Sequence, residues 1–140
     1  MSDHGYRRAE GSEGPRRAFR VTWGLRQGYG AEGRVLDLEE AVRAGARWMR
    51  RRAQSGEAFL TGMFTRAEVV YVNSDQGGAV DREPVAIFSG EVIPGRPGGE
   101  LDDDAVTALL DALAAEVGAA LDQEDVHVSY RDRAWTLRRR

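Results

Sequence analysis

The chain alternates between apolar and polar positions, and two long stretches with a helical repeat interrupt this alternation. In residues 18–26 every second side chain is large and apolar, whereas the positions between them hold Arg, Thr or Gly. The apolar positions are Phe19, Val21, Trp23 and Leu25. Alternation with a period of two predicts a strand that buries one face.

Apolar positions spaced three and four residues apart predict two helices. The first covers residues 38–54, and Asp37 followed three residues later by Glu40 has the spacing of a capping box at its start. The second is capped by Asp102. Its apolar stripe consists of Val106, Leu110, Leu113, Val117 and Leu121.

The other β-rich stretches complete a strand–helix–strand order in each half of the chain. Residues 59–72 contain a predicted bend or hairpin at 65–66, residues 73–82 are a predicted loop, and residues 85–93 are a predicted strand. Residues 125–132 form the last predicted strand. Its buried face consists of Val126, Val128 and Tyr130, and its opposite face of His127, Ser129 and Arg131.

This order predicts an α/β (α+β) fold of two pseudo-repeated β-α-β units, with a sheet that carries both helices on one face. We expect residues 1–17 to be a flexible tail, since they contain little apolar surface, residues 18–137 to be a single domain, and residues 138–140 to be a basic end. The uncovered sheet face should be exposed or covered by other subunits.

Composition narrows the chemistry. The 140 residues carry a net charge of -3, and all 20 basic residues are arginine. The acidic balance argues against nucleic acid as a partner, and the missing lysine excludes Schiff-base and P-loop lysine chemistry. No cysteine is present, which fits a cytoplasmic location. No stretch is apolar enough to predict a membrane span or a secretory signal.

Few motifs point to a cofactor or a metal. Gly28, Gly30 and Gly33 have the spacing of a dinucleotide fingerprint, but the helix is capped only at Asp37, too late for its N-terminus to meet a pyrophosphate. His127 has no second His or Cys at ligand spacing, so no metal site and no cofactor are predicted. His127 remains a candidate general base near neutral pH, or a surface histidine with a satisfied hydrogen bond.

The second half of the chain resembles the tautomerase superfamily, in particular proteins like macrophage migration inhibitory factor. The resembling positions are Glu83-Pro84-x-Ala86, Ser89, Ile93, the helix over 109–121, Asp125-Val126-x-Val128-x-Tyr130-x-Asp132 and Trp135. The resemblance implies a homotrimer with ligand pockets between subunits.

The chain differs from this family at the positions of the family's catalytic and pocket residues. Such proteins use an N-terminal proline as their catalytic base or acid, whereas Pro15 is internal here and its amide nitrogen takes no proton. The family's pocket lysine falls near Ser55, and its pocket tyrosine and asparagine correspond to His127 and Ser129. The resemblance therefore implies the pocket without the usual mechanism.

The leading hypothesis is a tautomerase-like homotrimer whose intersubunit pocket binds a small organic ligand, such as an anionic carbonyl compound. If it is an enzyme, it is expected to be an isomerase that transfers a proton. The candidate bases are His127 and Glu91, and the candidate ligand-binding residues are Arg20, Arg26, Phe59, Ile93 and Ser129. The alternatives are a non-catalytic interaction or assembly protein, and a ferredoxin-like dimeric α/β-barrel that binds a ligand.

Overall fold

The computed structural model describes residues 4–28 and 32–140. Its elements are β1 (Ala18–Gly24), α1 (Leu38–Gln54), β2 (Met63–Asn73), the 3-10 turn η1 (Ser74–Gln76), β3 (Ala79–Glu91), α2 (Asp103–Ala120), β4 (Asp125–Tyr130) and β5 (Arg133–Arg138).

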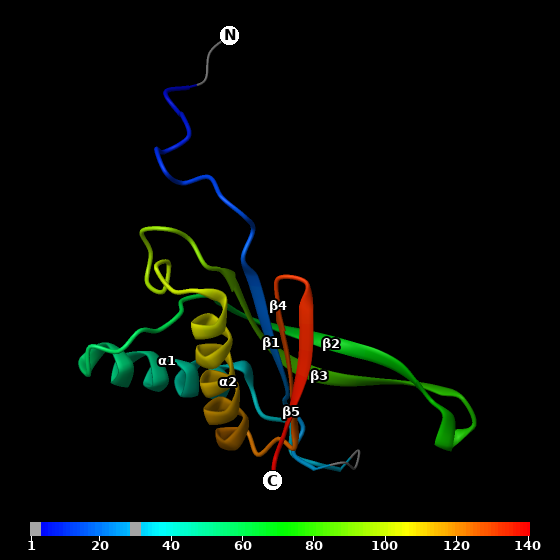
Figure 1. Ribbon diagram of the computed structural model, residues 1–140. Helices are drawn as coiled ribbons and strands as arrows, with labels where there is room; N and C mark the ends of the chain where they lie inside the picture. The colour runs from blue at the N-terminus through cyan, green and yellow to red at the C-terminus, as the bar shows by residue number, and fades with distance from the viewer. Residues whose placement is uncertain (1–3, 29–31) are drawn as a thin grey trace.

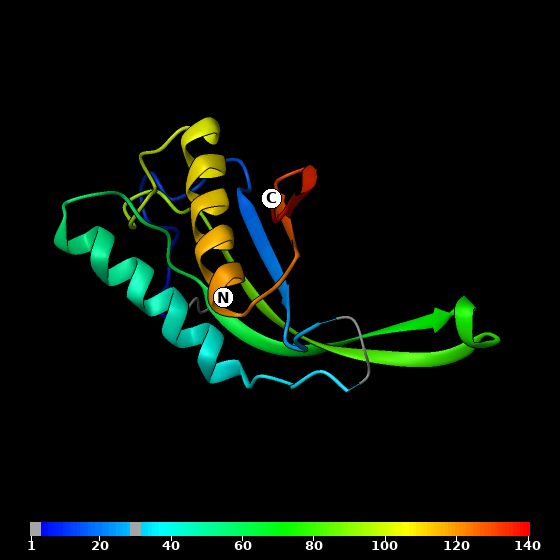
Figure 2. The same cartoon turned by 90° about the horizontal axis from the view of Figure 1, so that it is seen from below.

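The strands form one antiparallel sheet in the order β2-β3-β1-β4-β5. Both helices lie on the same side of this sheet (Figures 1 and 2). In each β-α-β unit the two strands run parallel but are separated by a strand of the other unit. This is the split β-α-β arrangement of ferredoxin-like proteins. The α+β class and the two helices on one face are confirmed.

The hydrophobic core lies between the helices and the covered sheet face. The central strand β1 contributes three of the four apolar side chains predicted to be buried, and the fourth, Leu25, is buried directly after the strand. The predicted stripe of the second helix is also buried, from α2 to its C-cap Leu121. Trp23 donates a hydrogen bond from Nε1 to the carbonyl oxygen of Ala114 in α2, at 3.0 Å. Phe88 of β3 lies 5.6 Å from Phe19 and 4.9 Å from Phe64, measured between ring centroids. Burial of each large apolar side chain stabilises the fold by about 1.5–3 kcal/mol relative to leaving it exposed.

Both predicted helix starts are confirmed. Asp37 accepts a hydrogen bond from the Glu40 amide, and the Glu40 carboxylate accepts one from the Asp37 amide, each at 3.2 Å. Asp102 accepts a bond of 2.8 Å from the amide of Ala105. These bonds satisfy amides that the first turn of a helix leaves unpaired.

The bend predicted at residues 65–66 is wrong. Thr65 and Arg66 pair with Ile87 and Ala86 in an unbroken register that runs from Met63 to the turn at η1. Most of the predicted loop over 73–82 is instead the turn and the start of β3. The outer part of this hairpin pairs with no other strand, because the pairing of β3 with β1 begins only at residue 85.

The hairpin between β4 and β5 was not predicted. The strand expected over residues 125–132 ends at Tyr130, and Arg131 takes a left-handed conformation, with φ of 56°. No Gly or Asn marks this turn in the sequence, so the usual hairpin signal is missing. Trp135 in β5 lies on the helix side and donates a 2.7 Å hydrogen bond to Asp111 of α2. Arg138 is the last residue of β5.

Candidate functional site

The sheet face without helices carries a row of small and polar side chains. Arg20 on β1 is opposite Ser89 on β3 and opposite Ser129 on β4. One step along the sheet, Thr22 is opposite Ile87 and His127. Alternation places these side chains on the face opposite the core, because their neighbours Phe19, Val21 and Trp23 are buried under the helices.

Two hollows lie over this face, and Arg20 and Ser129 line both of them. The larger has a volume of 1220 Å³ and extends over β1, β2, β3 and the β4–β5 turn. The smaller has a volume of 330 Å³ and lies over β1, β4 and β5, beside His127. Small-molecule sites typically have volumes of about 300–1,000 Å³. The smaller hollow is within this range and the larger exceeds it, so Arg20 lies where a hollow of ligand size meets a wider one.

Arg20 is available to bind an anion. Its side chain is exposed, and within residues 4–28 and 32–140 it makes no hydrogen bond or ion pair. The hydroxyl groups of Ser89 and Ser129 flank it on the neighbouring strands. A guanidinium group can bind a carboxylate through two parallel hydrogen bonds. This geometry suits a small carboxylate-bearing ligand.

The two candidate bases lie at opposite sides of Arg20. Glu91 lines the larger hollow and forms an exposed ion pair of 2.9 Å with Arg16. His127 lines the smaller hollow, and its Nδ1 lies 3.0 Å from the hydroxyl oxygen of Thr136 on β5. The sheet thus brings Arg20, Ser129, Glu91 and His127 to one face.

The other predicted site residues lie elsewhere. Arg26 follows β1 and forms an isolated bridge with Val35, Phe59 packs against the core, and Ile93 is exposed beyond the end of β3. None of the three lines either hollow. Of the glycine pattern, Gly30 lies outside the described residues.

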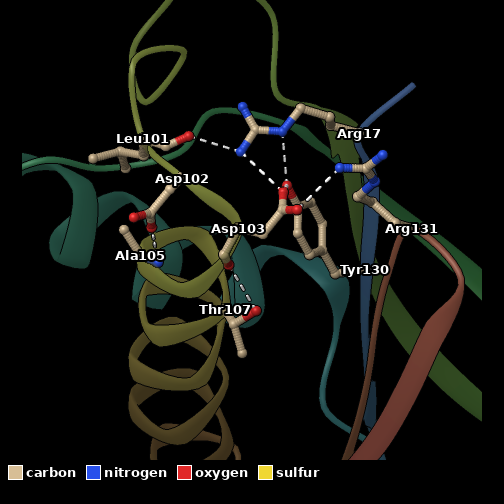
Figure 3. Close-up of polar contacts among 8 residues, drawn as sticks. All are labelled: Arg17, Leu101, Asp102, Asp103, Ala105, Thr107, Tyr130 and Arg131. Carbon is tan, nitrogen blue, oxygen red and sulfur yellow. Dashed lines mark hydrogen bonds and ion pairs between the residues drawn. The ribbon is translucent and has the colours of Figure 1, made fainter. Parts of the chain in front are cut away.

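A cluster of charged and phenolic groups forms the rim of the larger hollow, at the start of α2 (Figure 3). Tyr130 donates a hydrogen bond of 2.6 Å to Asp103, and Arg17 donates one of 2.8 Å to the Tyr130 hydroxyl. Arg17 also donates to the carbonyl oxygen of Leu101, at 2.7 Å. Arg131 forms a 3.0 Å ion pair with the second oxygen of Asp103.

The cluster changes the titration of its two acidic groups. The hydrogen bond from Tyr130 and the nearby guanidinium groups of Arg131 and Arg17 hold the pKa of Asp103 below its usual value, against a smaller opposing effect of desolvation. Burial, and then the hydrogen bond to Asp103, raise the pKa of Tyr130. The sequence pattern did not single out Asp103, and Arg17 falls within residues 1–17, which were predicted to be a flexible tail. The Arg17 side chain is 16% exposed.

We expect Asp103→Asn to remove a stabilising interaction that depends on pH. Because the folded pKa of Asp103 lies below its unfolded value of about 3.9, its stabilising effect is present above that value and is lost as pH falls through the folded pKa. Melting temperatures measured from pH 7 to strongly acidic pH should therefore show a wild-type advantage that disappears in acid. Asp104→Asn, one residue later, is the control. Equal melting of wild type and Asp103→Asn at every pH would contradict this assignment.

No group of three or more potential metal ligands occurs among the described residues. In that same part of the chain, no helix is long and apolar enough to cross a membrane.

The sequence matches no protein-family model and no curated protein. The structure matches two solved structures of a phage SAM lyase, where SAM is S-adenosylmethionine. The lyase in complex with S-methyl-5'-thioadenosine has a TM-score of 0.65 and 18% sequence identity, covering 93% of this chain and 95% of the lyase. The lyase in its apo state has a TM-score of 0.65 and 17% identity, covering 96% and 95%. At this level of identity the match establishes a shared fold.

This match corrects the resemblance to the tautomerase superfamily, which is wrong. The matched lyase has a different fold from that of the tautomerases. The residues that carried the resemblance have structural roles here: Pro84 and Ala86 are buried positions of β3, and Val126 and Val128 are buried positions of β4. These positions are apolar because the strands pack against the core there, and several α+β folds share this pattern.

Proposed function

We propose that this chain binds S-adenosylmethionine on the open sheet face, with Arg20 as its main polar anchor. The observation that carries the proposal is the likeness to the phage SAM lyase along almost the whole of both chains, because one of the matched structures contains S-methyl-5'-thioadenosine. The smaller hollow over the open face has the volume of a small-molecule site, and the larger hollow adjoins it at Arg20 and Ser129.

The charges of SAM fit the charges of this face. Its methionine part carries a carboxylate, for which the unpaired guanidinium of Arg20 and the hydroxyls of Ser89 and Ser129 are suitable donors. SAM also carries an ammonium group and a sulfonium cation. Glu91, in the same hollow, provides a carboxylate to face a cation. In this arrangement the smaller hollow, beside Thr22 and His127, holds the nucleoside part of SAM.

Lyase chemistry is the reaction class that follows from the proposal. Conversion of SAM into S-methyl-5'-thioadenosine breaks the bond between the sulfonium sulfur and the amino-acid chain. The sulfur keeps the bonding electron pair and becomes a neutral thioether. The carbon that loses the sulfur gains a bond in the same reaction, either from an oxygen of the substrate's own carboxylate, which closes a lactone, or from the electron pair of an adjacent C–H bond whose proton passes to a base, which forms an alkene. A site that fixes the carboxylate at Arg20 holds the departing chain in one orientation, and orientation is a major source of catalytic rate.

We expect calorimetric titration of the purified protein to detect 1:1 binding of SAM per chain, and chromatography of the mixture to detect S-methyl-5'-thioadenosine if bound SAM is cleaved. Adenosine and methionine, offered separately, should each bind more weakly, since each supplies only half of the contacts. Absence of heat and of thermal stabilisation with SAM at millimolar concentration would contradict the proposal. Binding without product would favour the second candidate, a binding protein without catalysis.

A further inference from the structure

The exposed side of α1 carries four arginines, which we call the arginine stripe: Arg43, Arg47, Arg50 and Arg51. They follow one another at intervals of four, three and one residues, which at about 100° per residue places them within about 100° of the helix circumference. Trp48, on the other side of the helix, is buried. Because α1 belongs to the helix layer, the stripe lies apart from the open sheet face (Figure 2).

Two members of the stripe have no partner within residues 4–28 and 32–140. Arg47 and Arg50 form neither a hydrogen bond nor an ion pair there. The other two form exposed ion pairs with carboxylates: Arg43 with Glu39, and Arg51 with Glu116 of α2. Exposed ion pairs are weak because water screens both charges. The guanidinium groups of the stripe are therefore available to another anion.

Helix stability accounts for only part of this basic surface. A cation is favourable in the last turn of a helix, where the helix dipole is negative, and Arg51 and Arg52 lie in that turn. Arg52 also turns inward and donates a hydrogen bond to the carbonyl oxygen of Ala58. Arg43 and Arg47 lie before the last turn, so the dipole gives no reason for them.

The positive charge of α1 is a local feature of an acidic chain. The net charge of -3 argues against nucleic acid for the molecule as a whole, but residues 41–56 contain five arginines and no acidic residue. Surface charges are screened over about 8 Å at physiological ionic strength, so acidic groups elsewhere do not cancel this potential. The C-terminal end of α1 also projects away from α2 (Figures 1 and 2). A polyanion can therefore reach the stripe.

We propose that the arginine stripe binds the phosphate backbone of double-stranded DNA. A guanidinium group binds a phosphate through two parallel hydrogen bonds. From Arg43 to Arg51 the stripe spans about 12 Å, at about 1.5 Å per residue. About three to four phosphates cover this length, since they are spaced about 3.4 Å apart along the axis of one strand. Phosphate contacts read no bases, so binding is independent of sequence. The inference does not depend on SAM binding.

The geometry of α1 favours DNA over other polyanions. A helix that inserts into a membrane surface needs a free apolar face, whereas the apolar face of α1 is buried through Ala41, Ala44 and Trp48. The major groove of DNA is about 12 Å wide and admits a helix, but that of duplex RNA is deep and narrow. A DNA duplex therefore allows the projecting end of α1 to lie between two rows of phosphates.

Fluorescence anisotropy with a labelled DNA duplex of arbitrary sequence tests the proposal. We expect the full chain to bind at low salt, with a slope of log K against log salt of about -3, because each neutralised phosphate contributes about -0.9. Arg47→Gln/Arg50→Gln should make this slope shallower by about 2 and weaken binding at least about tenfold. Arg7→Gln/Arg8→Gln, which removes the same charge from the exposed tail, is the matched control and should change binding less than about twofold.

Absence of binding at about 100 μM protein, the weak end of non-specific DNA binding, would overturn the proposal. An equal loss in both double variants, or no loss in Arg47→Gln/Arg50→Gln, would also overturn it, since the contact would then depend on net charge or lie elsewhere. Phosphatidylserine vesicles and an RNA duplex of the same sequence are tested in parallel, and tighter binding to either would contradict DNA as the ligand. Equal melting temperatures show that the variants remain folded, as expected because glutamine favours a helix nearly as well as arginine.

Discussion

Replacement of Trp23 by alanine is expected to destabilise the fold by about 3–5 kcal/mol. The side chain is fully buried, stacks against Phe64 and donates its hydrogen bond to the carbonyl oxygen of Ala114. A loss of this size is a large part of the roughly 5–15 kcal/mol that stabilises a typical domain. It should lower the melting temperature by more than about 10 °C, measured by circular dichroism.

The matched control is Trp135→Ala, which removes the same side chain from the edge strand. Trp135 is only half-buried and its hydrogen bond goes to Asp111. We expect Trp135→Ala to lower the free energy of unfolding by less than half as much as Trp23→Ala, because the edge strand can relax and admit water. Equal losses from the two variants would contradict the assignment of the core to β1 and its helix neighbours.

Arg20→Gln is expected to separate the binding of SAM from that of S-methyl-5'-thioadenosine. The guanidinium contacts the carboxylate of SAM in our proposal, and S-methyl-5'-thioadenosine has no carboxylate. Loss of a charged hydrogen bond costs about 1.5–3 kcal/mol, so the affinity for SAM should fall about 10- to 100-fold. The affinity for S-methyl-5'-thioadenosine should remain within about twofold. Calorimetry on both ligands measures the difference.

Arg47→Gln, on an exposed position of α1, serves as the control and should change neither affinity. Equal loss of both ligands in Arg20→Gln would indicate that the substitution disturbs the sheet rather than a carboxylate contact. Unchanged affinity for SAM would show that Arg20 does not contact the ligand.

The elements that were predicted correctly are those determined by interactions within a few residues of the chain. The alternation through Val21 and Trp23 gave β1, and the acids at Asp37 and Asp102 gave both helix starts, because capping and periodicity act within a few residues. The opposite faces of β4 were also predicted, since Val126 is buried and His127 is exposed. These features need no knowledge of which strands are neighbours.

The features that were missed depend on contacts between distant residues. The strand order places β3 between β1 and β2, and no local pattern encodes that choice. The turn at Arg131 contains no glycine, so neither this turn nor the start of β5 was predicted. Arg17 was assigned to the tail because its partners Asp103 and Tyr130 are 86 and 113 residues away. Buried positions shared by many α+β folds were interpreted as evidence for one family.

The candidate site was predicted in part. Arg20, Ser129, Glu91 and His127 come together because alternation places them on the face that the helices leave open. The remaining predicted residues, Arg26, Phe59 and Ile93, precede or follow strands, where alternation no longer determines direction. Their separation from the hollows is a consequence of loop paths that the sequence pattern does not specify.

The most direct test of the account is a nuclear magnetic resonance titration of ¹⁵N-labelled protein with SAM. We predict that the largest changes in chemical shift occur at Arg20, including its side-chain Nε, and at the amides of Thr22, Ser89 and Ser129, while the exposed face of α1 is unaffected. Changes confined to the helices, or no change at saturating SAM, would contradict a ligand site on the open sheet face.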